Sequence, residues 1–201
     1  GGAEAKAVAD ILGILRETGG RAHICHVSHP RVAELIREAK AEGLRVTAET
    51  CMHYLLFTGD DLIAHGGAFK CSPPLRDRAA ADGLFAYLAD GTLDTVCSDH
   101  SPCRLDEKDA SGPEGMFGAW GGISGVQTTL AGLWDYTVNR KHASPTLVAR
   151  VLSANPARIF GIADRKGRLA PGLDADFVLL DPEQPWEVRA DSLAYLNKFS
   201  A

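Results

Sequence analysis

Apolar residues recur at helical spacing in the first segment of the chain. Between Glu4 and Thr18 they repeat every three to four positions, and the glycine pair 19–20 ends the pattern, so we predict an amphipathic helix. Residues 22–28 form a compact apolar run that predicts a strand. Helical spacing returns over residues 31–41, and the β-branched run 44–51 predicts a second strand.

The middle of the chain continues this alternation around one irregular insertion. We expect His53 to lie in a loop after the second strand and residues 58–67 to form a short helix or turn. Two prolines within residues 69–76 favour an extended loop. Residues 78–88 follow helical spacing, and residues 93–98 predict a third strand.

Strands that alternate with helices of this length require parallel pairing and crossover connections. A (β/α)8 barrel and a doubly wound sheet both satisfy this requirement. No Gly-x-Gly-x-x-Gly follows a predicted strand, and no Gly-Lys-Ser or Gly-Lys-Thr occurs, which disfavours the nucleotide-binding open sheets. The barrel is therefore the favoured α/β fold, with its chemistry at the carboxyl ends of the strands.

The segment after the third predicted strand is irregular at first and then helical. Residues 107–125 are rich in glycine and too long for a simple connector, so we expect an active-site loop. Helices are predicted over residues 123–139, over 145–152 behind the cap residue Ser144, and over 155–160. These helices would cover the outside of the barrel.

The pattern changes near Ala163, where we place a domain boundary. Residues 166–172 are turn formers, and residues 176–181 predict a strand. We assign residues 1–163 to the barrel and residues 164–201 to a second module. This second module has too few apolar residues for a core of its own, so we expect it to pack against other parts of a longer chain.

Composition narrows the function classes. The 201 residues are 45% hydrophobic and 23% charged, an ordinary globular balance. A net charge of −5 without a basic stripe argues against nucleic-acid and anionic-membrane partners and favours a small substrate. No apolar run approaches a membrane span and no signal peptide is visible, so we expect a cytoplasmic protein. The five cysteines include no Cys-x-x-Cys pair, which predicts reduced thiols.

Two polar residues stand where predicted strands end. His26 lies near the C-terminal end of the first predicted strand and Asp99 at the end of the third, and strand alternation would point both side chains at the barrel mouth. Metal hydrolases use imidazoles and carboxylates in such places. Each residue alone has a simpler explanation, because strand histidines are often core residues and an Asp before Ser-Pro often forms a turn.

Other possible site residues have weaker support from the sequence. His23 lies on the opposite face of its strand, so we expect it to pack in the core or to contact a metal-binding side chain, and His100 could support Asp99. Cys97-x-x-His100-x-x-Cys103 has a spacing similar to zinc sites, but Cys97 and Asp99 face one way and the proline restricts the rest. Cys103 as a nucleophile would need a base and a lowered pKa.

Six motifs together resemble the cyclic amidohydrolases, the group of allantoinases, hydantoinases and dihydroorotases. In order, the motifs are His23-Ile-Cys-His-Val-Ser28, Glu49-Thr-Cys-Met-His-Tyr54, Lys70-Cys-Ser-Pro-Pro-Leu-Arg-Asp77, Ser98-Asp-His-Ser-Pro-Cys103, Trp120-Gly-Gly-Ile-Ser-Gly-Val-Gln127 and Lys166-Gly-Arg-Leu-Ala-Pro-Gly-Leu-Asp-Ala-Asp176. Among the branches, the sequence looks most like the allantoinases. Dihydroorotases typically carry a His at the position of Cys103 and hydantoinases an Asn at that of Trp120.

The resemblance implies the C-terminal half of a (β/α)8 TIM barrel with part of a small β-sandwich domain. It also implies two divalent metal ions, usually zinc, hydrolysis of a cyclic amide such as allantoin, and a homotetramer. Matched by position, His26 would bind the second metal, and Asp99 would bind the first metal and shuttle a proton. The Ser72 backbone would hydrogen-bond the ring of the substrate, Trp120 would shape the pocket and His53 would line it.

Several expected parts have no counterpart in this sequence. The His-x-His of the first barrel strand, the carboxylated lysine of the fourth and the histidine of the fifth are missing, and three strands cannot close a barrel. We therefore expect a piece of a longer enzyme that is inactive and poorly stable alone. A hydantoinase, dihydropyrimidinase or dihydroorotase is the alternative activity. A non-catalytic scaffold relative is the alternative of another class, although His26 and Asp99 argue against it.

Overall fold

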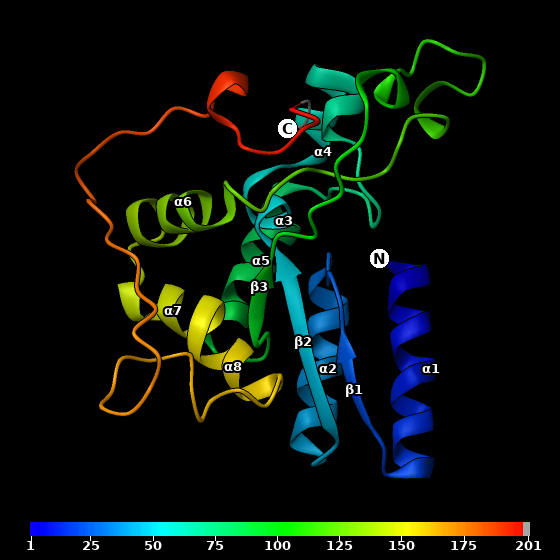
Figure 1. Cartoon of the computed structure of the whole chain (residues 1–201). Helices are drawn as coiled ribbons and strands as arrows, with labels where there is room; N and C mark the ends of the chain where they lie inside the picture. The colour runs from blue at the N-terminus through cyan, green and yellow to red at the C-terminus, as the bar shows by residue number, and fades with distance from the viewer. Residues whose placement is uncertain (199–201) are drawn as a thin grey trace.

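A parallel three-stranded sheet lies at the centre of the computed structural model, which describes residues 1–198 (Figure 1). The strands, in their order across the sheet, are β1 (Arg21–Ile24), β2 (Arg45–Cys51) and β3 (Thr95–Cys97). In this register His23 pairs with Thr47, and Cys51 pairs with Cys97. Because the strands are parallel, their carboxyl ends meet at one edge of the sheet.

Helices cover the back and both sides of this sheet. They are α1 (Gly2–Thr18), α2 (Pro30–Ala41), α3 (Met52–Leu56), α4 (Gly59–His65), α5 (Arg78–Ala89), α6 (Thr129–Trp134), α7 (Pro145–Ala149) and α8 (Asn155–Ile159). Two π-helical turns, Asp135–Arg140 and Arg150–Ala154, continue α6 and α7. In Figure 1, α2 and α5 lie behind the strands, α1 beside β1, and α6 to α8 beyond β3. Within residues 1–198, no helix has the length and apolar character to cross a membrane.

Local signals explain where the long helices begin and end. α1 stops at Gly19, whose left-handed φ of 64° lets its N–H bond to the Leu15 carbonyl. The His29 side chain caps α2 by accepting the N–H of Arg31 at 3.1 Å. Asp77 caps α5 by accepting the N–H of Ala80 at 2.8 Å. The helices that we predicted in these regions are confirmed, with ends shifted by a few residues.

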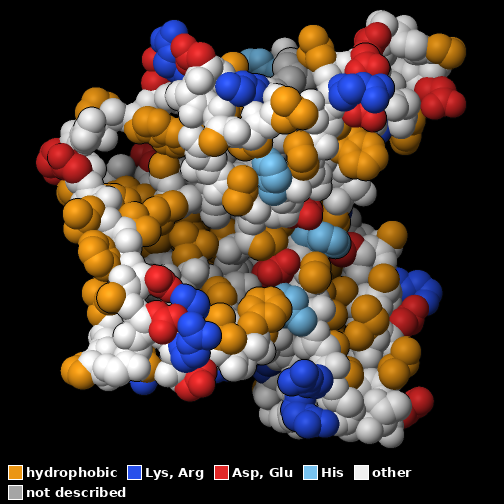
Figure 2. Space-filling model, viewed as in Figure 1, with side chains coloured by type: hydrophobic (Ala, Val, Ile, Leu, Met, Phe, Trp, Pro, Cys, Tyr) orange, Lys and Arg blue, Asp and Glu red, His pale blue; other side chains and the backbone are white. Residues whose placement is uncertain are grey.

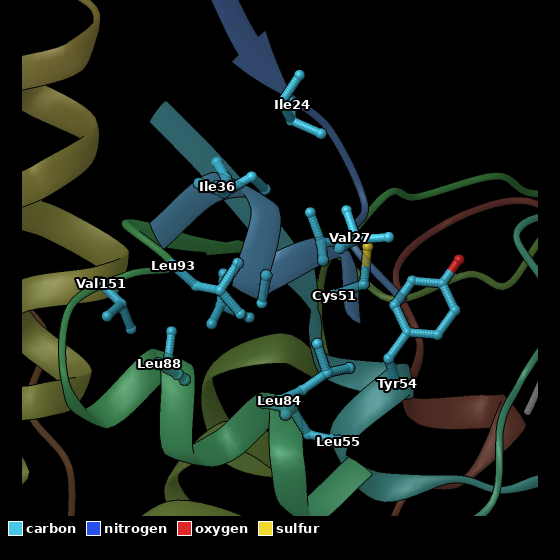
Figure 3. Close-up of a cluster of buried hydrophobic side chains, with 14 of the residues drawn as sticks. Ile24, Val27, Ile36, Cys51, Tyr54, Leu55, Leu84, Leu88, Leu93 and Val151 are labelled. Carbon is cyan, nitrogen blue, oxygen red and sulfur yellow. The ribbon is translucent and has the colours of Figure 1, made fainter. Parts of the chain in front are cut away.

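The core fills the space between the sheet and its helices (Figure 3). Ile36 of α2 and Leu84 and Leu88 of α5 are fully buried, as are Leu93 before β3 and Val151 after α7. Each such side chain stabilises the fold by about 1.5–3 kcal/mol. This packing holds the sheet rigid, and the sheet in turn fixes the loops at its carboxyl edge.

Three expectations about secondary structure are wrong. His53 lies in the short helix α3 and not in a loop, because β2 passes directly into a single helical turn. The helix expected from residue 123 begins at Thr129, because the Gly125 carbonyl first accepts the N–H groups of Thr128 and Thr129 in a turn. Residues 176–181 form no strand, since no other described segment pairs with their backbone.

Candidate active site

His26, His53 and Asp99 follow the carboxyl ends of three adjacent strands. His26 lies shortly after β1, His53 lies in the first turn of α3 directly after β2, and Asp99 lies shortly after β3. The parallel order β1-β2-β3 brings these positions to one edge of the sheet. Histidine and acidic side chains gather in the hollowed middle of the face in Figure 2. Residues far apart in the sequence therefore share one region of the surface.

His26 and Asp99 share an uncommon backbone conformation. Both have a φ of 42°, in the left-handed region that residues other than glycine rarely adopt. A conformation of this kind costs on the order of 1–3 kcal/mol and persists only where the surroundings enforce it. The strands end before either residue, at Ile24 and Cys97. The left-handed turn, and not the strand alternation that we expected, therefore sets the direction of each side chain.

The imidazole of His53 is buried and incompletely satisfied. Its side chain is almost inaccessible, at 2% exposure, and its Nε2 has no hydrogen-bond partner among the described residues. Burial, followed by the nearby positive charge of His26, lowers the pKa of His53 to about 4. His53 is therefore neutral near pH 7 and carries an unused nitrogen at the sheet edge.

Asp99 completes a compact group with His53 and Cys51. One ligand atom of each of the three side chains lies within 4.8 Å of the other two. Cys51 also lies 3.4 Å from Cys97, sulfur to sulfur, and this hydrogen bond and burial raise the pKa of Cys51. The sequence analysis missed Cys51 as a site residue, although the parallel register of β2 and β3 could have placed it opposite Cys97, close to Asp99.

This group fits a divalent metal ion. A carboxylate and a neutral imidazole are the ligand types that zinc and related ions bind, and a thiol can join them as a thiolate. The unsatisfied Nε2 of His53 can meet either such an ion or a molecule bound beside it. His26 lies close enough to lower the pKa of His53 and so approaches the same region from β1.

Ser72 and Trp120 belong to two loops that lie against each other. A Cβ on Gly121 would lie 3.4 Å from the Ser72 Cβ, an ordinary van der Waals distance, so the two loops are in contact. Trp120 is 47% exposed and Ser72 is exposed as well, so both can meet a ligand. The structure thus brings together the two residues for which we expected substrate contacts.

Two lysines tie these loops together. Lys70 donates from Nζ to the carbonyl of Phe117 at 2.9 Å and to that of Ala119. Lys108 is buried, which lowers its pKa, and it donates to the carbonyl of Lys70 at 2.9 Å and to that of Gly122. These hydrogen bonds therefore hold the glycine-rich segment against the loop that carries Ser72.

Further contacts join the group around Asp99 to the loops. Tyr54, next to His53, donates its hydroxyl to the Pro73 carbonyl at 2.9 Å. His100 accepts the N–H groups of Gly125 and Val126 on Nδ1 at 3.2 and 3.4 Å. His100, which we expected to support Asp99, thus holds the loop that follows Trp120. The group around Asp99 and the two loops that carry Ser72 and Trp120 are therefore parts of one connected region.

An ion pair braces the loop that carries His26. Glu4 accepts the N–H and the hydroxyl of Ser28 at 2.9 and 2.7 Å, and Arg76 donates to Glu4 at 3.1 Å. Arg76 also donates to the Ser28 hydroxyl. Helix α1, the loop after β1 and the loop of Ser72 are therefore fixed relative to one another.

Comparison with known proteins agrees with this arrangement. Residues 5–200 match the model of the amidohydrolase family. The chain is 44% identical over 197 residues to an allantoinase from Enterococcus faecalis and 41% identical over 199 residues to one from Streptomyces avermitilis. It covers 42% and 43% of these two relatives, and 98% and 99% of the chain is aligned. The chain thus spans less than half the length of the curated relatives it matches.

Solved structures give the same result for the fold. An L-hydantoinase from Arthrobacter aurescens superposes with a TM-score of 0.90 at 32% identity, over 98% of this chain and 44% of that one. A D-hydantoinase from Thermus sp. superposes with a TM-score of 0.90 at 27% identity, over 98% and 43%. The expected part of a (β/α)8 barrel is confirmed. The chain belongs to the amidohydrolase family.

Proposed function

We propose that this chain supplies the C-terminal part of an active site that hydrolyses a cyclic amide, with allantoin as the substrate. One observation carries the proposal: Asp99 lies beside a buried, neutral His53 whose Nε2 has no partner among the described residues. The identity to allantoinases supports the choice of substrate.

The residues of this chain would hold part of a two-metal centre. We assign His26 and Asp99 as ligands, with zinc as the expected metal and the remaining ligands outside this chain. The chemistry that the ions supply when bound is polarisation of the ring carbonyl and of the attacking water. The left-handed turns at His26 and Asp99 hold both side chains in place before the ions bind.

Asp99 is the proposed proton carrier. Its carboxylate accepts a proton from the attacking water and returns it to the ring nitrogen as the amide bond breaks, so the carboxylate is restored after each turnover. His53 stays neutral beside it and lines the pocket, where its Nε2 can hydrogen-bond the substrate. Burial of His53 also excludes water from this side of Asp99.

The two loops position the substrate. We assign the backbone of Ser72 to the amide edge of the ring and the indole of Trp120 to a wall of the pocket. The close approach of Gly121 to Ser72 and the lysine contacts to neighbouring carbonyls support these roles, because they hold both loops in a fixed arrangement.

A substrate panel tests the proposal. The protein that carries this chain is assayed with allantoin, hydantoin, dihydrouracil and dihydroorotate, and its metal content is measured. We expect the highest kcat/KM with allantoin and about two zinc ions per complete site. Absence of hydrolysis for all four substrates in the metal-loaded protein would refute the proposal.

Hydantoinase activity is the second candidate. Both superposed structures with TM-scores of 0.90 are hydantoinases, and this observation favours a five- or six-membered cyclic amide other than allantoin. Trp120 is the residue that we expect to decide between the two activities. A higher kcat/KM for hydantoin than for allantoin would select this candidate.

Three further properties are proposed from the resemblance alone: zinc as the metal, a homotetramer as the assembly and the cytoplasm as the location. The non-catalytic scaffold remains the alternative of another class. Measured zinc content and turnover distinguish it from the enzyme, because a scaffold without metals would show neither.

A further inference from the structure

A second group of metal-type side chains lies on β1 and β2, outside the site described above. His23, Cys25 and Glu49 each present one ligand atom within 4.8 Å of the other two. None of these three residues is assigned a role in the proposed hydrolysis. The group combines an imidazole, a thiol and a carboxylate, a mixed set that suits borderline ions such as zinc and cobalt.

His23 is oriented by a partner on the neighbouring strand. Its Nδ1 lies 2.8 Å from the Thr47 hydroxyl, and the sheet register pairs these same two residues. Metal-binding histidines usually donate one ring N–H to such a partner, which leaves the other nitrogen free to bind the ion. The contact to Thr47 therefore selects Nε2 as the ligand atom.

The free nitrogen of His23 is buried without a hydrogen bond. Nε2 is inaccessible to solvent and has no hydrogen-bond partner in the described part of the chain, although Glu49 Oε2 lies 3.3 Å away. This contact is an ion pair when the ring is protonated, whereas in the neutral ring the buried Nε2 has no hydrogen bond, which is costly. An ion between the imidazole and the carboxylate would satisfy both groups.

Cys25 gives the group access to solvent. Its side chain is exposed, while the side chains of His23 and Glu49 are only 23% and 17% exposed. In the 201-residue chain an ion can therefore enter past the thiol and meet the two more buried ligands. Ligand atoms around a tetrahedral ion lie about 3.3–3.7 Å apart, so small side-chain rotations suffice to close the observed arrangement.

This group is separate from that of Asp99. Glu49 precedes Cys51 by two positions on β2, which places it on the same face of the sheet about 7 Å further from the carboxyl edge. We propose that His23, Cys25 and Glu49 form an additional metal site, distinct from the two-metal centre. It has three protein ligands and one open position, and it binds a divalent zinc-type ion independently of His26 and Asp99.

Cobalt(II) titration of the metal-free 201-residue chain tests this proposal, once far-ultraviolet circular dichroism has shown that the chain is folded. The background carries His26→Ala and Asp99→Asn, so the site of the proposed function cannot contribute and its failure stays distinguishable. We expect a near-ultraviolet thiolate-to-cobalt absorption band in this background. Adding Cys25→Ser should remove the band, and adding Glu49→Gln or His23→Gln should weaken cobalt binding at least tenfold.

Two matched cysteine variants serve as controls. Cys51→Ser removes the thiol of the other group, and Cys103→Ser removes a buried thiol in the glycine-rich loop region. Both should keep the band. Since Cys25 is exposed, Cys25→Ser should preserve the fold, which far-ultraviolet circular dichroism checks. A band that survives Cys25→Ser, a band lost with Cys51→Ser, or no band in the background would each overturn the proposal.

Discussion

The position of Asp99 beside other possible metal ligands matters as much as its own carboxylate. It meets His53 and Cys51 because β2 and β3 are adjacent and parallel, and its backbone adopts a left-handed turn directly after β3. In the proposed mechanism Asp99 is both a metal ligand and a proton carrier, so no other side chain can replace it fully. Its role is therefore open to a direct test.

Asp99→Asn should abolish turnover while the fold is kept. The amide has nearly the same shape and tolerates the left-handed backbone, but it cannot accept the proton. We expect kcat for allantoin to fall by at least about 10²–10⁴-fold in the protein that carries this chain. Steady-state kinetics and circular dichroism measure the two parts of the prediction, and near-normal kcat would remove Asp99 from the mechanism.

His53 should make the metal-free chain sensitive to acid. Its pKa is about 4 in the folded state against 6.5 for the ordinary group, so between these values the unfolded state binds more protons. Stability contributed by the neutral imidazole is therefore complete above about pH 6.5 and is lost as the pH falls towards 4. The shift of about 2.5 corresponds to about 3 kcal/mol.

Urea denaturation of the metal-free chain at pH 7 and pH 4.5 measures this effect. In His53→Gln the free energy of unfolding should fall less over this interval than in the unchanged chain. The exposed His65, changed to Gln, is the matched control and should keep the full loss. Equal losses in His53→Gln and in the unchanged chain would contradict the assignment.

Two of the candidate residues could be proposed from the sequence because they lie at the C-terminal ends of predicted strands. His26 and Asp99 were found in that way. Cys51 was not, because its role depends on which strands are adjacent, and adjacency is not encoded in local spacing. The left-handed φ at His26 and Asp99 was also missed, because nothing in residue type distinguishes a strained turn from an ordinary strand end.

Capping side chains fix where the helices next to the site begin. Asp77 caps α5 immediately after the loop that contains Ser72 and Arg76, so the start of the helix and the end of this loop are fixed together. Arg76 in turn contacts Glu4 and Ser28, which connects this loop to α1 and to the loop after β1.

Asp77→Ala should destabilise the chain by about 1 kcal/mol, because the N–H of Ala80 loses the side-chain acceptor that is now 2.8 Å away. Asp77→Asn keeps an acceptor at the same position and is the control. Urea denaturation gives both free energies of unfolding. The capping explanation fails if the Asn and Ala variants lose the same stability.

Long elements were predictable and short or partner-dependent ones were not. The helices over residues 4–18, 31–41 and 78–88 have enough turns for their apolar spacing to be visible. Helix α3 is too short to show a period. The strand expected over residues 176–181 failed for another reason, since a strand forms only against a neighbour that supplies hydrogen bonds.

At the scale of the whole molecule, the sheet has three strands among the described residues, and the second module is largely exposed. Phe177, Val178 and Leu179 are 66%, 72% and 88% exposed. These apolar side chains support our proposal that residues 164–201 belong to a β-sandwich completed by other parts of a longer chain. The last three positions of that range lie outside the described residues.

The isolated 201-residue chain should therefore show no turnover. Three strands cannot enclose a substrate, and only two of the expected metal ligands are present. Allantoin hydrolysis and zinc content of the chain, measured beside the complete allantoinase from Enterococcus faecalis, test this expectation. Comparable activity per molecule in the two samples would show that the residues described here form a sufficient site.

The left-handed turns at His26 and Asp99 have a consequence for protein engineering. Glycine adopts this conformation without strain and asparagine does so at low cost, so either residue should fit these positions better than the present ones. A library screened only for heat resistance would then enrich exchanges that erase the proposed ligands. Stabilising this protein without loss of activity requires that both positions be excluded from randomisation.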